Sequence, residues 1–259
     1  DESEISKINN TPNINKFLLS EKFNTVLNKA LFYCDLSDGS YDITIEPLVE
    51  LWGFGKGNFS GFPNENNINN ALKNTGYNNI VLNGDTLIKK NINVKLDLNS
   101  IAKGYAVDEI YLLLENMGYS DFLIEIGGEL RSKGNNYYKN WIIGVQNPTN
   151  ISVIKKIKLN NYSMATSGTY NNYFEHDGQY YSHIINPKSG YPYEYSLLSA
   201  TIISKNCSDA DAYATMALTM QRSKFVDLTN KMTGIECYIV EVINNKINEY
   251  KSLNFDKFI

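Results

Sequence analysis

Segments typical of strands and of helices alternate along this chain, but they lack the regular strand–helix–strand rhythm of a doubly wound parallel sheet. Apolar residues recur at helical spacing over residues 20–32, and residues 209–220 are rich in alanine, so both segments are predicted helices. Residues 122–126 and 197–204 are typical of strands. This order favours an α+β fold over a doubly wound one.

The other predicted elements are shorter. Residues 41–51 alternate in a strand-like pattern that Pro47 interrupts, and residues 93–98 predict a strand that leads into a helix over 101–117. The remaining expectations are a loop over 56–70, a helix over 68–75, a hairpin that turns at 83–85, strands over 141–146 and 237–242, and turn-rich stretches without a clear period over 163–168 and 180–192.

Composition and charge exclude several classes of protein. The chain has 259 residues, of which 42% are hydrophobic and 20% charged, so it is long and apolar enough for a sizeable core. A net charge of −4 argues against a nucleic-acid partner, since phosphate binding needs clustered Lys and Arg. No apolar run reaches the roughly 18–20 residues of a membrane span. The three cysteines include no Cys-x-x-Cys pair, which argues against a zinc cage and leaves one disulfide as an alternative.

A carboxylate and a hydroxyl lie four residues apart in the alanine-rich helix. Asp211 and Thr215 therefore project from one helical face. Two oxygen ligands of this kind suit Mg²⁺ better than zinc. The alternative is structural, because acidic residues near a helix N-terminus also interact favourably with the helix dipole.

A second group of polar residues lies where the strand over 93–98 meets the following helix. Asp97 ends the strand, Asn99 or Ser100 caps the helix, and Lys103 lies in its first turn. Free backbone N–H groups and a lysine at a helix N-terminus can receive a phosphate or another anion. An ordinary capped helix explains the same residues.

His183 lies in a polar and aromatic stretch, where a histidine can act as a general base or serve only a structural role. The other histidine, His176, precedes Asp177-Gly178 and is predicted at a hairpin turn. Asp42 and Thr44 either line a pocket that binds a ring of a ligand or only contribute to packing. No dinucleotide-binding, Walker A or Gly-x-Ser-x-Gly motif is present, which argues against those three kinds of site.

Seven segments occur in an order that points to one family. They are residues 3–9, 38–55, 97–108, 127–128, 165–170, 182–187 and 210–215. In this order they resemble the ApbE flavin transferases, which are FAD:protein FMN transferases. The resemblance covers nearly the whole chain, so it implies one such domain over residues 1–259, with mixed or antiparallel central sheets flanked by helices.

The resemblance also implies site residues and an activity. It assigns FAD contacts to Ser40, Tyr41, Asp42, Asp97, Lys103 and Ile185, Mg²⁺ ligation to the side chains of Asp211 and Thr215 and the carbonyl of Ser100, and a role in the transfer to His183. Enzymes of this family cleave the FAD pyrophosphate and attach FMN through a phosphoester to a Thr or Ser of an acceptor protein. AMP is released. The alternatives are a Mg²⁺-dependent FAD pyrophosphatase, in which water replaces the acceptor hydroxyl, and a flavin-binding protein without catalysis.

The chain departs from the family pattern in three places. The family normally begins with a strand and a helix that precede the residue matching Asp1, so we expect both to be absent here. Asn186 stands where an Asp is usual, and Ala214 stands where some members carry a further acidic residue.

The resemblance further implies a location and partners. It places the protein in the periplasm or on the extracytoplasmic face of the cell membrane, with a lipid anchor upstream of Asp1. The expected partners are redox proteins that carry the acceptor Thr or Ser.

Overall fold

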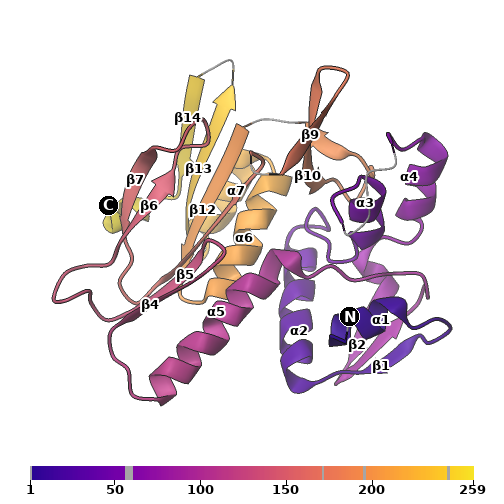
Figure 1. The fold of residues 1–259 in the computed structure, drawn as a ribbon, viewed down its shortest axis with the longest axis horizontal. Coiled ribbons are helices and arrows are strands. Elements are labelled where there is room, and N and C mark those ends of the chain that lie inside the picture. Colours follow the sequence, from indigo (N-terminus) through magenta and orange to yellow (C-terminus); the bar gives the residue numbers. More distant parts are fainter. Residues whose placement is uncertain (1, 56–60, 171, 195–196, 244–245) are drawn as a thin grey trace. The chain divides into compact units, whose positions relative to one another are not determined.

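The computed structural model describes residues 2–55, 61–170, 172–194, 197–243 and 246–259. Its contacts divide the chain into two compact units, one formed by Asp1–Leu98 with Phe174–Glu194 and the other by Asn99–Tyr173 with Tyr195–Ile259 (Figure 1). Each unit is therefore assembled from two separate stretches of sequence. The expectation of one functional domain over residues 1–259 stays a prediction.

The first unit combines helices with two small sheets. Its helices are α1 (Glu4–Asn10), α2 (Glu21–Leu36), α3 (Glu46–Leu51), α4 (Glu65–Leu72) and the short 3₁₀ helix η1 (Tyr77–Asn79). Its strands are β1 (Lys16–Leu18), β2 (Ile80–Asn83), β3 (Thr86–Lys89), β9 (Tyr173–His176), β10 (Gln179–Ile185) and β11 (Pro192–Glu194), paired in the orders β1-β3-β2 and β11-β10-β9. The predicted helix over residues 20–32 is confirmed by α2, which begins after the capping side chain of Ser20.

The second unit is built on a six-stranded sheet in the order β14-β13-β12-β8-β5-β4. These strands are β4 (Phe122–Ile126), β5 (Glu129–Lys133), β8 (Ser163–Gly168), β12 (Leu197–Ser204), β13 (Glu236–Ile243) and β14 (Lys246–Lys251). The other elements are β6 (Ile142–Gln146) and β7 (Val153–Lys158), which pair with each other, and α5 (Asn99–Asn116), α6 (Cys207–Thr219), α7 (Arg222–Asn230) and η2 (Phe255–Phe258). Every strand pair of the six-stranded sheet is antiparallel, which confirms the predicted α+β fold.

Helices α5 and α6 cross with their backbones in close contact. A Cβ on Gly104 in α5 would lie 2.4 Å from the carbonyl oxygen of Cys207 and 2.8 Å from the Cβ of Asp211, so no larger residue fits. Helix α6 packs in turn against β8 and β12. Its alanines allow this approach, since Ala210, Ala212, Ala214 and Ala217 are all fully buried. The crossing fixes where the polar residues of both helices lie in the second unit.

Two of the predicted strands are wrong. Residues 41–45 form turns, and α3 occupies residues 46–51, because Pro47 lies in the first turn of a helix, where its fixed φ is favourable and its missing N–H costs nothing. Residues 93–98 join no strand. Leu96 N–H donates to the side chain of Asn9 (2.8 Å), and Asp97 N–H donates to the carbonyl of Ile43 (2.7 Å), so these single partners replace a neighbouring strand.

Several other boundaries differ from the prediction. Strand β8 was not expected, because small residues that pack against a helix give no apolar period; its Ala165 is fully buried. Strands β10 and β14 were also not expected. Helix α4 begins at Glu65, earlier than predicted, because Asn64 caps it. Of the loop expected over 56–70, residues 56–60 lie outside the described residues.

The structure also bears on the cysteines and on the apolar character of the helices. Cys34, Cys207 and Cys237 are all buried and free, so the disulfide alternative is wrong. Across the described ranges, no helix combines the length and the apolar character needed to cross a membrane.

Candidate active site

The predicted cation ligands lie on one face of helix α6 in the second unit. Asp211 is 2% exposed, and its Oδ2 accepts a hydrogen bond from Gly104 N–H (2.9 Å) across the helix crossing. Thr215 lies one turn further along, where its hydroxyl is 3.4 Å from the hydroxyl of Ser167 on β8. Both oxygens thus belong to rigid elements. The structure brings this pair together as the four-residue spacing predicts.

Helix α5 contributes the other predicted residues of the second unit. Ser100 lies in its first turn, and Lys103 lies in the next. The ammonium of Lys103 is 2.5 Å from Oε1 of Glu129 at the start of β5. The side chain of Lys103 is about half exposed, whereas that of Glu129 is buried. Sequence reasoning did not single out Glu129.

Burial raises the pKa of the Asp211 carboxyl to about 7, and the negative charge of Glu129 adds to the shift. The N–H of Gly104 and the charge of Lys103 act in the opposite direction. Burial also raises the pKa of Glu129, which Lys103 partly offsets. The charge of one buried carboxylate therefore acts on another, and Lys103 offsets only part of the cost, so the arrangement favours a further positive charge.

The donor set fits a hard divalent cation. Oε2 of Glu129 is buried and has no hydrogen-bond partner among the described residues. The Asp211 carboxylate, the Thr215 hydroxyl and the Ser100 carbonyl are all oxygen donors, which Mg²⁺ prefers. No group of three or more His, Cys, Asp or Glu residues suited to a metal occurs in the described parts of the chain. The assignment of these ligands stays a prediction.

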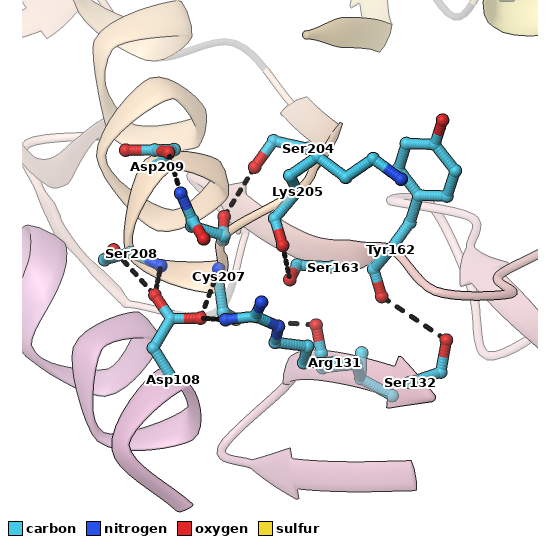
Figure 2. Close-up of polar contacts among 12 residues, drawn as sticks. Asp108, Arg131, Ser132, Tyr162, Ser163, Ser204, Lys205, Cys207, Ser208 and Asp209 are labelled. Atoms are coloured by element: carbon cyan, nitrogen blue, oxygen red, sulfur yellow. Dashed lines mark hydrogen bonds and ion pairs between the residues drawn. The ribbon is translucent and has the colours of Figure 1, made fainter. Parts of the chain in front are cut away.

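Asp108 anchors the N-terminus of α6 to α5 (Figure 2). Its carboxylate accepts hydrogen bonds from the N–H groups of Cys207 (2.8 Å) and Ser208 (2.9 Å) and from the Ser208 hydroxyl (2.7 Å). It also pairs with Arg131 of β5, whose guanidinium lies 3.7 Å from the centre of the Tyr111 ring. Asn206, the N-cap residue, makes no capping bond with its own side chain, so Asp108 replaces it. The sequence placed Asp108 in a motif but gave it no role.

The first unit holds Ser40, Tyr41 and Asp42 in the turn after α2. Asp42 Oδ1 accepts from the N–H (2.8 Å) and hydroxyl (2.6 Å) of Thr44, and its Oδ2 accepts from the N–H of Tyr77 (2.9 Å). Burial raises the pKa of Asp42, and these hydrogen bonds oppose the shift. The Asp42 carboxylate thus shapes its own turn, which favours the structural alternative for this side chain.

Asp97 lies beside this turn, because its N–H donates to the carbonyl of Ile43 (2.7 Å). The structure therefore brings together four of the residues predicted to contact FAD: Ser40, Tyr41, Asp42 and Asp97. Tyr41 is 3% exposed, so its ring belongs mainly to the core.

His183 and Ile185 lie on β10 of the same unit. The ring of His183 is half-buried and meets the edge of the Phe54 ring, with 6.3 Å between centroids. Phe54 contacts Phe174, which stacks on Tyr181 at 5.3 Å. Ile185 is buried against the core cluster that contains Trp52, so its side chain serves packing. His183 therefore lies in a largely aromatic environment.

The two positions that depart from the family pattern have local explanations. Asn186 Oδ1 accepts from the N–H groups of Lys188 (2.9 Å) and Ser189 (3.3 Å), so the amide shapes the turn that leads to Gly190. Ala214 is fully buried in α6, where a larger acidic side chain would need room.

A family model and whole-length relatives agree on where the chain belongs. The model of the ApbE family matches residues 1–239. The chain belongs to the ApbE family. A curated relative from Vibrio cholerae, an FAD:protein FMN transferase, is 35% identical over 262 residues that cover 100% of this chain and 78% of the relative. One of the same name from Haemophilus influenzae is 33% identical over 99% of this chain and 77% of its own length.

Solved structures agree with the ApbE assignment. The flavin transferase ApbE from Vibrio cholerae has a TM-score of 0.90 at 32% identity and covers 99% of this chain and 83% of its own. The ApbE protein from Thermotoga maritima has a TM-score of 0.89 at 34% identity, covering 100% of this chain and 84% of its own. The resemblance stated from the sequence is thereby confirmed.

The anchor of α6 in this ApbE-family chain gives a test of stability. Asp108→Asn removes the charge that serves Arg131 and two backbone N–H groups, and we expect the free energy of unfolding to fall by about 3 kcal/mol. Urea denaturation measures it. The control is Glu115→Gln on the same helix, α5. It breaks an exposed ion pair with Lys133 of β5 and should lower the free energy of unfolding by less than about 1 kcal/mol. Equal losses in the two variants would contradict the anchoring role.

The raised pKa of Asp211 predicts a pH dependence without metal. The unfolded carboxyl is ionised above about pH 4, whereas the folded one stays protonated until about pH 7, so folding takes up a proton between these values. In a chelating buffer the free energy of unfolding should therefore fall by about 1 kcal/mol between pH 6 and pH 8.

Chemical denaturation at the two pH values measures this change. Asp211→Asn should remove the fall, and added Mg²⁺ should restore stability at pH 8 in the unchanged chain only. A fall of equal size in Asp211→Asn would assign the pH dependence to another group.

Proposed function

We propose that this chain is an FAD:protein FMN transferase that attaches FMN to a Thr or Ser hydroxyl of an acceptor protein and releases AMP. The observation that carries the proposal is the pair of the buried Asp211 and the partly buried Thr215 on α6, found in a chain that matches transferases of this name over its whole length. Its all-oxygen donors suit the Mg²⁺ that a pyrophosphate cleavage uses. A flavin-binding protein without catalysis has no need of such a pair.

In the proposed reaction the acceptor hydroxyl oxygen attacks the phosphorus of the FMN half of FAD. A new oxygen–phosphorus bond forms, the pyrophosphate bond to the AMP half breaks, and AMP leaves with its phosphate oxygen. Bound Mg²⁺ would neutralise the negative charge that develops on the phosphates. Asp211, Thr215 and the Ser100 carbonyl would hold it, and the ammonium of Lys103 would contact the anionic part of FAD.

His183 would take the proton of the acceptor hydroxyl, which is a poor nucleophile until a base removes it. Of the two histidines in the chain, His176 is the less suited. It lies at the end of β9, stacked on Phe62 with 4.9 Å between ring centroids, beside the turn at Asp177 and Gly178. Both turn residues have positive φ, which confirms the predicted hairpin.

The transfer is tested by incubating the chain with FAD, Mg²⁺ and an acceptor domain that carries the target Thr. Covalent flavin fluorescence on a denaturing gel and AMP in solution are the two readouts. We expect both products, and we expect His183→Ala and Asp211→Asn to lower the rate at least about 100-fold, because each removes a group that acts in the reaction. FAD binding should remain largely intact in His183→Ala.

Matched controls are available for both substitutions. His176→Ala removes the other histidine, and Asp209→Asn makes the same charge change on α6; both should keep near-normal rates. AMP together with free FMN and an unlabelled acceptor would instead identify a pyrophosphatase. FAD binding without either product would identify a carrier.

We also propose that the protein acts outside the cytoplasm, held at the membrane by a lipid anchor, on redox proteins that carry the acceptor residue. The support is the family resemblance of the sequence. Fractionation of cells that express the natural full-length protein tests the location, together with protease treatment of intact and opened cells. The proposed location would be contradicted if the protein resists protease in cells whose envelope is opened outside an intact cytoplasmic membrane.

A further inference from the structure

Glu129 occupies an unusual position for a carboxylate. It is the first residue of β5 and follows a tight turn in which Gly127 and Gly128 have φ of +61° and +101°. Its backbone pairs with Ile126 in the antiparallel ladder of β4 and β5. The residue is 2% exposed, so a group that is normally solvated is held inside the second unit.

The two oxygens of this carboxylate have different surroundings. Oε1 is 2.5 Å from the ammonium of Lys103, whereas Oε2 is buried and has no hydrogen-bond partner among the described residues. A purely structural ion pair in a protein interior normally satisfies both oxygens, because an unpaired one loses its hydration without replacement. Holding this carboxylate next to Lys103 with one oxygen unpaired therefore lowers the stability of the fold.

The turn before Glu129 lies close to this pair. A Cβ on Gly127 would lie 3.5 Å from Cδ of Lys103 and 3.6 Å from Oε2 of Glu129, so the bare glycine backbone lies against both side chains. The side chain of Lys103 is 47% exposed. Its stem therefore runs from α5 past the glycine turn, and its ammonium contacts a buried carboxylate while the side chain stays partly open to solvent.

We propose that Glu129 is a positioning residue that holds the ammonium of Lys103 in the orientation in which it binds the pyrophosphate of FAD. A free lysine side chain populates many rotamers, and fixing it before the ligand arrives removes that cost from binding. The inference rests on the proposed function, since it takes FAD as the ligand of Lys103.

The test is a double-mutant cycle on FAD binding. Glu129→Gln, Lys103→Met and the double variant are titrated with FAD in metal-free buffer, and quenching of flavin fluorescence gives the dissociation constants. We expect each single variant to bind FAD roughly 10-fold more weakly, as is typical when a supporting residue is removed. The double variant should bind no more weakly than Lys103→Met, because in the proposal Glu129 affects FAD binding through that lysine.

Glu125→Gln is the matched control. It removes the same charge from an exposed position on the neighbouring strand β4, and it should leave the dissociation constant unchanged. In steady-state transfer assays Glu129→Gln should raise KM for FAD more than it lowers kcat. If Glu129→Gln fails to fold in thermal denaturation, Glu129→Asp takes its place in the cycle, since it keeps the charge but withdraws the carboxylate by one methylene.

Three results would overturn the inference. The first is equal FAD binding by Glu129→Gln and Glu125→Gln. The second is a double variant whose loss of FAD affinity is the product of the two single losses. The third is an effect of Glu129→Gln confined to kcat. The proposed function fails separately: a chain that binds FAD but labels no acceptor contradicts the transferase, while the binding cycle still decides the role of Glu129. A chain that binds no FAD contradicts both.

Discussion

The position of α6 depends on the carboxylate of Asp108. This single side chain supplies acceptors for two N–H groups and a hydroxyl at the start of the helix, and it pairs with Arg131 from β5. An alanine-rich helix has little side-chain chemistry with which to fix its own register, and Asn206 provides no capping bond. The anchor therefore determines where Asp211 and Thr215 lie relative to α5, and Gly104 then allows the two backbones to meet.

Charge is distributed in the second unit so that function and stability oppose each other. Asp211 and Glu129 are both buried, and each is held in place by only part of what would satisfy it: an N–H from Gly104 and an ammonium from Lys103. Groups with raised pKa values of this kind concentrate at sites where a ligand completes the charge balance. The first unit differs, because both oxygens of the partly buried Asp42 carboxylate accept hydrogen bonds, one from Thr44 and the other from the N–H of Tyr77.

The sequence predicted what depends on local spacing and missed what depends on distant partners. Asp211 and Thr215 could be placed on one face because helical periodicity fixes it. The roles of Asp108 and Glu129 could not be predicted, since their partners lie 99 and 26 residues away and only the fold brings them together. The strand-like alternation before Pro47 gave a wrong prediction because the proline begins a helix. Strand β8 was missed because the small side chains that pack against α6 produce no apolar period.

The discontinuity of the two units has a consequence for how the chain is made. A ribosome that has released the first 98 residues has not yet made the strands β9, β10 and β11, which belong to the same unit. The indole N–H of Trp52 donates to the carbonyl of Gly190, so this buried tryptophan lacks its hydrogen-bond partner until 138 further residues have been made. The second unit is likewise finished only when residues 195–259 emerge. The first unit can therefore complete its core only after Glu194 has left the ribosome, and the second only after its last strands have done so, and simple truncation cannot yield either one alone.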